Sequence, residues 1–146
     1  MTNKPTIGIA LIARDVEKTI EQCIESFIDT VQQCVVIFAG KSADKTELIV
    51  KRLAKQYKPK IHFDSFDWID DFAAARNYSF SKLTTDWLMW IDADDIVYQP
   101  ENMHEIIKNI TPDVGGIWFP YHYALDEFGN VVTKYERERL LRASCG

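Results

Sequence analysis

The chain alternates short, wholly apolar runs with longer segments whose apolar residues recur at helical spacing, and this alternation restricts its fold more than any other feature. The apolar runs predict strands at Thr6–Ala13, Val35–Ala39, Ile61–Asp64 and Trp87–Ile91. Their lack of polar and apolar alternation indicates strands that are buried on both faces. Helical segments lie between the runs, so we expect a three-layer α/β/α sandwich around a mainly parallel sheet.

The segments around the apolar runs contain the predicted helices. Apolar residues from Val16 to Val31 predict a helix of about five turns after the first strand. Two further helices are expected, one across Leu48–Ala54 and one across Pro100–Asn109. Between them, Asp70 or Asp71 is expected to cap a helix that runs from Phe72 to about Lys82, because carboxylates accept hydrogen bonds from the first helical amides.

A turn sequence at Asp126–Asn130 separates two extended segments, Gly116–Leu125 and Val131–Arg139, and predicts a late β-hairpin. A length of 146 residues fits a single domain across residues 1–146. The amphipathic pattern continues almost to the last residue, without the polar tail of a finished domain. We therefore expect the chain to be a fragment of a longer protein.

Composition excludes several classes of protein. A net charge of -5 argues against non-specific nucleic-acid binding, which needs a basic surface. No apolar run approaches the roughly 20 residues that cross a bilayer, so no transmembrane segment is expected. Cys23, Cys34 and Cys145 show no metal-binding spacing. We expect the first two to be buried, and the chain to occupy a reducing, cytoplasmic setting.

Three carboxylates, Asp92, Asp94 and Asp95, directly follow the fourth predicted strand. In an extended chain Asp92 and Asp94 point to the same side, so both can approach one ion. Hard carboxylate oxygens suit Mg²⁺ or Mn²⁺, which often add phosphate oxygens to their coordination shell. The alternative is an aspartate-rich turn that closes the strand and caps the next segment of the chain. The residues alone favour the two interpretations equally.

The wider sequence resembles family-2 glycosyltransferases of the GT-A fold, a Rossmann-like architecture. Asp71–Asn77 matches the family pattern D-F-A-x-A-R-N, and Asp86–Asp95 matches an acidic residue, an apolar strand and D-A-D-D. Ser42–Thr46 is close to the S-T-D-x-T loop, and Tyr135–Arg142 is similar to the R-L-F-R segment after the family's hairpin. The resemblance covers nearly the whole chain and is most specific where the first two motifs occur together.

The resemblance implies a metal-dependent enzyme that transfers a sugar from a nucleotide-sugar donor, with inversion, to a glycan, protein or lipid acceptor. Asp94 would ligate the divalent metal, Mn²⁺ or Mg²⁺, that bridges the donor's diphosphate. Asp92 would assist by contacting the ribose or the metal's waters. Ala93, between them, would also contact the donor.

The resemblance places further residues in the donor pocket. Ala13 and Arg14 would line it where the first strand ends. Arg76 would lie near the nucleobase or the diphosphate, whose acceptors a guanidinium fork matches. The alternative for Arg76 is a surface ion pair with Asp70 or Asp71.

One departure from the family pattern concerns the nucleobase. Ala39 occupies the donor-site position where the family usually carries an aspartate that bonds the base or ribose. Either other groups hold the base, for instance Asp64 or Asp67, or base selectivity is relaxed. UDP is the expected nucleotide.

The general base is expected beyond Gly146, because family members carry it after the hairpin. Asp126 and Glu127 have suitable chemistry, but a solvated hairpin tip is the expected role of both. His122 is the histidine closest to the predicted cleft, and Trp68 is the tryptophan expected beside the donor.

Two other functions fit parts of the pattern. A haloacid-dehalogenase-like phosphatase also places D-x-D after an apolar strand, with the first aspartate as nucleophile. Here, however, the motif comes late in the chain, and Ile96 stands where a threonine or valine is usual. The other is a non-catalytic, glycosyltransferase-like module that binds nucleotide or carbohydrate, which the Ala39 departure favours.

Overall fold

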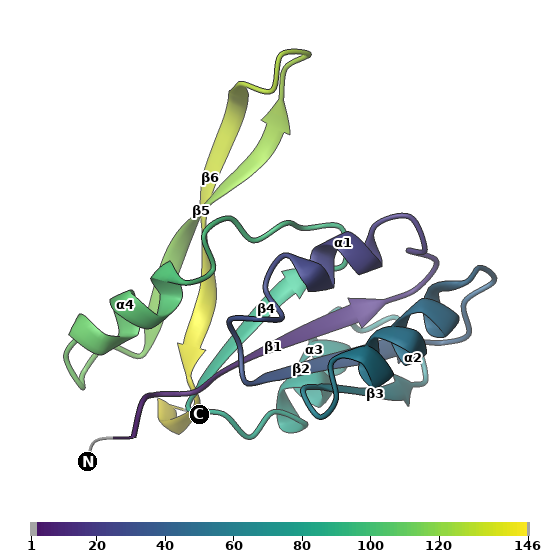
Figure 1. The fold of residues 1–146 in the computed structure, drawn as a ribbon, viewed down its shortest axis with the longest axis horizontal. Helices are drawn as coiled ribbons and strands as arrows, with labels where there is room; N and C mark the ends of the chain where they lie inside the picture. Colours follow the sequence, from purple (N-terminus) through teal and green to yellow (C-terminus); the bar gives the residue numbers. More distant parts are fainter. Residues whose placement is uncertain (1–2, 146) are drawn as a thin grey trace.

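A computed structural model describes residues 3–145, so Gly146 and the first two residues of the predicted domain lie outside the described residues. Within this range a six-stranded sheet has the order β3-β2-β1-β4-β6-β5 (Figure 1). The strands are β1 (Ile7–Ala13), β2 (Gln33–Ala39), β3 (Ile61–Phe66), β4 (Trp87–Asp92), β5 (Gly116–Leu125) and β6 (Val131–Arg142). The helices are α1 (Ile20–Glu25), α2 (Thr46–Gln56), α3 (Phe72–Ser81) and α4 (Asn102–Asn109), followed by a short 3₁₀ turn at Ala143–Cys145.

The first four strands run parallel, and β6 joins them in the opposite direction. In the register, Gly8 of β1 faces Gln33 of β2 on one side and Leu88 of β4 on the other. Trp87 of β4 pairs with Arg142 of β6 in antiparallel register. The predicted mainly parallel sheet and late hairpin are therefore confirmed.

Helices cover both faces of the sheet. In Figure 1, α1 and α2 lie on the near face and α3 lies behind β1 and β2. The larger hydrophobic core joins the sheet to α1, α2 and α4, and a smaller core joins it to the α3 side. This arrangement is the predicted three-layer α/β/α sandwich. Cys23 and Cys34 lie in the larger core, as expected. Among the described residues, no helix is long and apolar enough to cross a membrane.

The predicted five-turn helix after β1 is wrong in its extent, because α1 covers only six residues. The apolar stripe is nevertheless buried, with Phe27, Ile28 and Val31 at 1% exposure or less. After Glu25 the backbone includes hydrogen bonds to the residue three positions earlier, as in a 3₁₀-helix. The Thr30 N–H, for example, donates to Phe27 O at 2.9 Å. The Ser26 hydroxyl donates to the Cys23 carbonyl at 2.6 Å, a local bond that competes with helical pairing.

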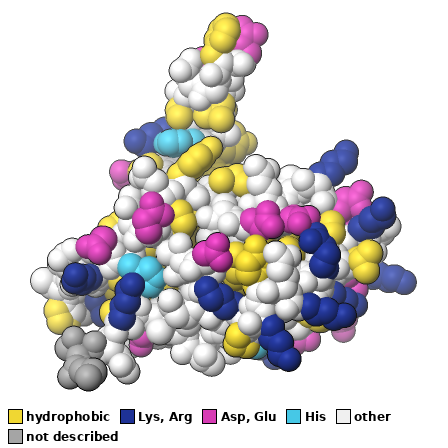
Figure 2. Space-filling view, viewed as in Figure 1, with side chains coloured by type: hydrophobic (Ala, Val, Ile, Leu, Met, Phe, Trp, Pro, Cys, Tyr) yellow, Lys and Arg dark blue, Asp and Glu magenta, His cyan; other side chains and the backbone are white. Residues whose placement is uncertain are grey.

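The β5–β6 hairpin projects from the body of the molecule beyond the last residues that pair with β4 (Figure 1). Its turn has the predicted form, with Asp126 N–H donating to Asn130 O at 2.9 Å and Gly129 at φ 84°. Hydrophobic side chains gather on this projecting arm (Figure 2). The exposed ones are Trp118, Tyr123, Leu125, Phe128, Val131, Val132 and Tyr135.

Candidate functional site

A cleft of about 820 Å³ opens where the carboxyl ends of β1 and β4 meet α3 and the loop after β1. Ligands of open α/β sheets bind at this edge. Six of the seven residues predicted for the donor and metal site line the cleft: Arg14, Ala39, Arg76, Asp92, Ala93 and Asp94. The seventh, Ala13, is fully buried beneath it and is not part of the lining.

One wall of the cleft is made by two loops that are bonded to each other. Asp15, with a left-handed φ of 52°, donates its N–H to the Ser42 hydroxyl and accepts a 2.7 Å bond from the Ala43 N–H. Glu17 N–H in turn donates to Asp44 Oδ2 at 3.0 Å. These reciprocal bonds fix the strand end that carries Arg14 and occupy the Asp44 carboxylate.

The helix α3 brings Arg76 into the cleft. As predicted, a carboxylate caps this helix: Asp71 accepts a 3.0 Å bond from the Ala74 N–H. The Arg76 guanidinium lies 3.6 Å from the centre of the Trp90 ring, and its Nη2 lies 4.0 Å from Asp92 Oδ1. Arg76 therefore pairs with the β4 carboxylate and not with the aspartates at the start of its own helix. Burial lowers the pKa of Arg76, and the Asp92 charge opposes that shift.

The carboxylates after β4 lie on a turn, so the extended geometry predicted for Asp92 to Asp94 is wrong. The strand ends at Asp92, and Asp95 N–H donates back to Asp92 O at 3.0 Å. The Asp92 N–H donates to Asp95 Oδ2, also at 3.0 Å. The aspartate-rich turn is thus present, but Asp95 closes it. Asp92 and Asp94 are left exposed on the cleft.

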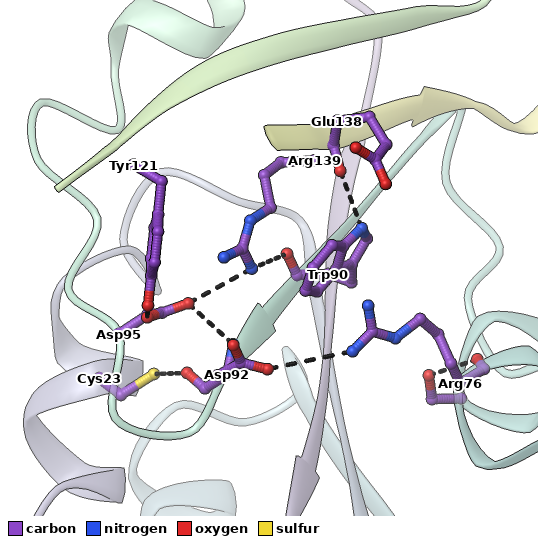
Figure 3. A network of polar contacts seen from close by, with 9 residues as sticks. Cys23, Arg76, Trp90, Asp92, Asp95, Tyr121, Glu138 and Arg139 are labelled. Atoms are coloured by element: carbon purple, nitrogen blue, oxygen red, sulfur yellow. Dashed lines mark hydrogen bonds and ion pairs between the residues drawn. The ribbon is translucent and has the colours of Figure 1, made fainter. Parts of the chain in front are cut away.

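Two side chains from the hairpin complete the surroundings of Asp95, and sequence reasoning missed both (Figure 3). Arg139 of β6 lies with Nη1 3.3 Å from Asp95 Oδ2 and donates to Trp90 O at 3.1 Å. The Tyr121 hydroxyl of β5 donates to Asp95 Oδ1 at 2.9 Å. The available signal was a charged residue next to the apolar pair Leu140 and Leu141, a position where β6 enters the core.

Two guanidinium groups lie against one indole ring. The Arg139 guanidinium is 3.8 Å from the centre of the Trp90 ring, and Arg76 stacks on the same ring at 3.6 Å. The Trp90 Nε1–H donates to Glu138 O at 3.0 Å, which fixes the plane of the ring. Planar guanidinium groups stack well on aromatic faces, so both cations are held beside the β4 turn.

The carboxylates of the turn after β4 are partly shielded from solvent. Burial raises the pKa of Asp92, the Asp95 charge raises it further, and Arg139 and Arg76 oppose the rise. Burial and the hydrogen bond to Asp95 raise the pKa of Tyr121 to about 12, so Tyr121 keeps its proton and donates it. The site therefore balances three carboxylates against two cations.

The carboxylates on the cleft suit a divalent cation that takes its remaining ligands from a bound molecule or from water. Asp92 and Asp94 offer carboxylate oxygens, the ligands that Mg²⁺ and Mn²⁺ prefer. Among residues 3–145, no three His, Cys, Asp or Glu side chains are placed to hold a metal together. Two carboxylates leave most of an octahedral shell for phosphate oxygens and water.

Aromatic residues line another part of the cleft. Trp68 and Phe72 meet edge to face at 5.3 Å, and Trp68 Nε1 donates to Asp70 Oδ1 at 2.7 Å. Phe72, which sequence reasoning assigned only to the helix, is 59% exposed. Ala39 lies among the same lining residues, so an apolar surface replaces the family's usual aspartate there.

The remaining sequence candidates lie away from the cleft lining. Asp126 is held within the hairpin turn, where it accepts bonds from the amides of Phe128 and Asn130. Glu127 is exposed beside it, and His122 is exposed on β5. None of these three belongs to the residues that line the cleft.

Comparison with known proteins identifies relatives of this arrangement. The sequence profile described as Glycosyl transferase family 2 matches residues 8–142. A TPR repeat-containing protein of Synechococcus elongatus is 33% identical over 61% of this chain and 20% of its own length. The glycosyltransferase SunS encoded by an SPbeta prophage of Bacillus subtilis is 29% identical over 73% of this chain and 24% of its own length. The chain thus spans about a fifth to a quarter of these curated relatives.

A solved structure shares the fold. The mannosyltransferase PcManGT of Pyrobaculum calidifontis, in complex with GDP-Man and Mn²⁺, aligns with a TM-score of 0.62. The alignment covers 79% of this chain and 35% of that protein, at 20% sequence identity. At that identity the likeness concerns the fold, which is the predicted GT-A architecture.

Proposed function

The chain belongs to glycosyltransferase family 2, and on that premise we propose that its cleft binds a nucleotide-sugar donor together with Mn²⁺ or Mg²⁺ for sugar transfer. The observation that carries the proposal is the position of Asp92 and Asp94 opposite Arg76 in one cleft of about 820 Å³. Carboxylates attract a divalent cation, and a guanidinium attracts phosphate, so the cleft has a partner for each part of a metal–diphosphate group.

The chain's own residues would act by holding and orienting the donor. Asp94 and Asp92 would hold the cation, which when bound supplies Lewis acidity to the departing diphosphate. Arg76, kept in place by the Trp90 ring, would donate hydrogen bonds to phosphate oxygens. Arg14 lines the same cleft directly after the end of β1, and its guanidinium would add a second positive side chain for the nucleotide's phosphates.

The nucleobase is assigned to the part of the cleft near Ala39, with UDP as the first candidate. Ala39 offers no carboxylate, while Trp68 and Phe72 offer aromatic surface nearby in the lining. The mannosyltransferase of similar fold binds GDP-Man, so GDP is the comparison nucleotide. Parallel titrations with UDP and GDP decide between them.

The general base and the acceptor site are assigned to parts of the protein outside these 146 residues. The curated relatives are several times longer than this chain, which covers 20% and 24% of two of them.

We also assign the protein to the cytoplasm, on the basis of its cysteine pattern and free cysteines. Cell fractionation tests this assignment.

Isothermal titration with UDP in the presence and absence of Mn²⁺ tests the donor proposal. Wild-type protein is expected to bind UDP with Mn²⁺ at least about tenfold more tightly than without it, because the cation bridges Asp94 and the diphosphate. Asp94→Ala should abolish that difference, whereas Asp29→Ala, at an exposed position outside the cleft lining, should preserve it. Equal UDP affinity with and without Mn²⁺ would rule the proposal out, and so would a UDP affinity that Asp94→Ala leaves unchanged.

A second function, a module that binds nucleotide or carbohydrate without catalysis, is favoured by Ala39. It predicts metal-dependent nucleotide binding without any turnover of UDP-sugar by the full-length protein. Release of UDP from several UDP-sugars in the presence of Mn²⁺, lost in Asp94→Ala, would exclude this alternative. The phosphatase alternative has no such support, because the family match extends over residues 8–142.

A further inference from the structure

Asp95 is the most heavily bonded carboxylate of the β4 turn. Its Oδ1 accepts a 2.9 Å bond from the Tyr121 hydroxyl. Its Oδ2 accepts a 3.0 Å bond from the Asp92 N–H and lies 3.3 Å from Arg139 Nη1. The side chain is only 12% exposed. Both oxygens of Asp95 are thus committed to protein donors, whereas Asp94 is exposed and accepts no bond from any residue between 3 and 145.

The two side-chain donors come from the hairpin and not from the strand that carries the turn. Arg139 is 5% exposed and is stacked on Trp90, and its Nη1 also reaches Trp90 O. A buried guanidinium needs a counter-ion, and Asp95 is its ion-pair partner in this structure. The Tyr121 hydroxyl of β5 donates to the other oxygen of Asp95, so both strands of the hairpin contact Asp95 (Figure 3).

We propose that Arg139 and Tyr121 are positioning residues that withhold Asp95 from the metal. The cation then finds two carboxylates, Asp92 and Asp94, and needs the donor's diphosphate to complete its shell. This inference rests on the proposed function, because the cation and the diphosphate are those of the donor site. It makes metal binding conditional on the nucleotide, which prevents a cation from occupying the turn tightly by itself.

The proposal predicts a gain that a purely structural role of Arg139 does not. Loss of Arg139 leaves Asp95 without its counter-ion, beside two other carboxylates. A third hard ligand and a further negative charge strengthen divalent-cation binding. A residue that only stabilised the fold, without a charge beside the acidic turn, would when removed weaken metal binding or leave it unchanged.

Titration of the folded chain with Mn²⁺ alone provides the test, with Arg139→Gln compared to wild type. Arg139→Gln is expected to bind Mn²⁺ alone about tenfold more tightly than wild type, because one more carboxylate becomes available. Arg137→Gln, a change of an exposed arginine two residues earlier on β6, is the matched control and should bind Mn²⁺ as wild type does. Equal or weaker Mn²⁺ binding by a folded Arg139→Gln protein would overturn the proposal.

Asp95→Asn keeps the test decisive if Arg139→Gln does not fold, because asparagine retains the shape and an acceptor oxygen. Its Mn²⁺ affinity with UDP present is expected to stay within about threefold of wild type, since Asp95 is not a ligand. A loss of about a hundredfold or more, beyond the cost typical of a residue that only orients the ligands, would overturn the proposal. The comparison in Mn²⁺ alone needs no nucleotide, so it remains readable even if UDP binding, and with it the proposed function, fails.

Discussion

Arg76 Nη2 lies 4.0 Å from Asp92 Oδ1 across the cleft, so a cation of α3 faces the first carboxylate after β4. Arg76 comes from α3 and Asp92 from β4, and the Arg76 guanidinium is stacked on the Trp90 ring. Each of them has a chemically distinct partner in the proposed donor, since phosphate suits the guanidinium and the metal suits the carboxylate. When the donor binds, we therefore expect Arg76 to contact the phosphate and Asp92 to contact the metal.

Substitution of Arg76 should weaken nucleotide binding without weakening the binding of the metal alone. Arg76→Gln removes a cation that competes for Asp92, so Mn²⁺ alone should bind as tightly as in wild type or more tightly. UDP with Mn²⁺ should bind about tenfold more weakly, because a charge-assisted phosphate contact is lost. Calorimetry measures both. Arg52→Gln, which breaks an exposed pair with Glu21 on the surface, is the control and should change neither. Unchanged UDP affinity would show that Arg76 does not contact the donor.

Gly8 is expected to be intolerant of any side chain. A Cβ at this position would lie 2.5 Å from Thr85 Oγ1 and 2.7 Å from Leu83 Cδ2, where the start of β1 meets the loop before β4. Gly8→Ala should therefore lower the free energy of unfolding by about 1–3 kcal/mol through overpacking. Urea denaturation measures the loss. Gly115→Ala, whose Cβ would meet the exposed Cys145 at 3.2 Å, should have a smaller effect, and an equal effect would contradict this explanation.

Asp86 should make stability depend on pH in acid. Hydrogen bonds from the Thr6 N–H and hydroxyl, both 2.8 Å long, hold the pKa of Asp86 below its usual value. The folded state then binds fewer protons than the unfolded state between the two pKa values. The resulting stabilisation is present above the unfolded pKa of about 3.9 and is lost as pH falls through the folded pKa.

Asp86→Asn should consequently lower the urea midpoint at neutral pH, and its difference from wild type should shrink as pH falls below the unfolded pKa of about 3.9. Urea titrations at neutral pH and at successively lower pH values check this. Asp67→Asn, at an exposed residue with no partner among residues 3–145, is the control. A difference between Asp86→Asn and wild type that persists undiminished in acid would show that the charge of Asp86 is not the cause.

The strands and the helix cap were predictable because their signals are local. The apolar runs ending at Ala13 and Ala39 mark the ends of their strands to the residue. Asp71 was one of two aspartates predicted to cap α3, and it does so. In contrast, the stripe from Val16 to Val31 is buried as predicted, but periodicity alone could not indicate that Ser26 would tighten the backbone after Glu25.

The surroundings of the acidic turn were not predictable, because they depend on partners far away in the sequence. Asp95 meets Tyr121 and Arg139 only because β6 inserts between β4 and β5. Extended geometry also misplaced Asp94, since the chain turns immediately after Asp92. The sequence therefore identified the two carboxylates on the cleft but not the contacts that leave them exposed there.

The strand order has a consequence for synthesis on the ribosome. Strand β6, which follows the other five described strands in the sequence, lies inside the sheet, where Leu140, Leu141 and Arg142 pair with the strand that carries the acidic turn. Until those residues emerge, β4 presents an open edge to any other nascent or unfolded chain. Released chains that end before Leu140 should therefore aggregate more readily than chains that extend past Arg142, because only the longer chains cover this edge of β4.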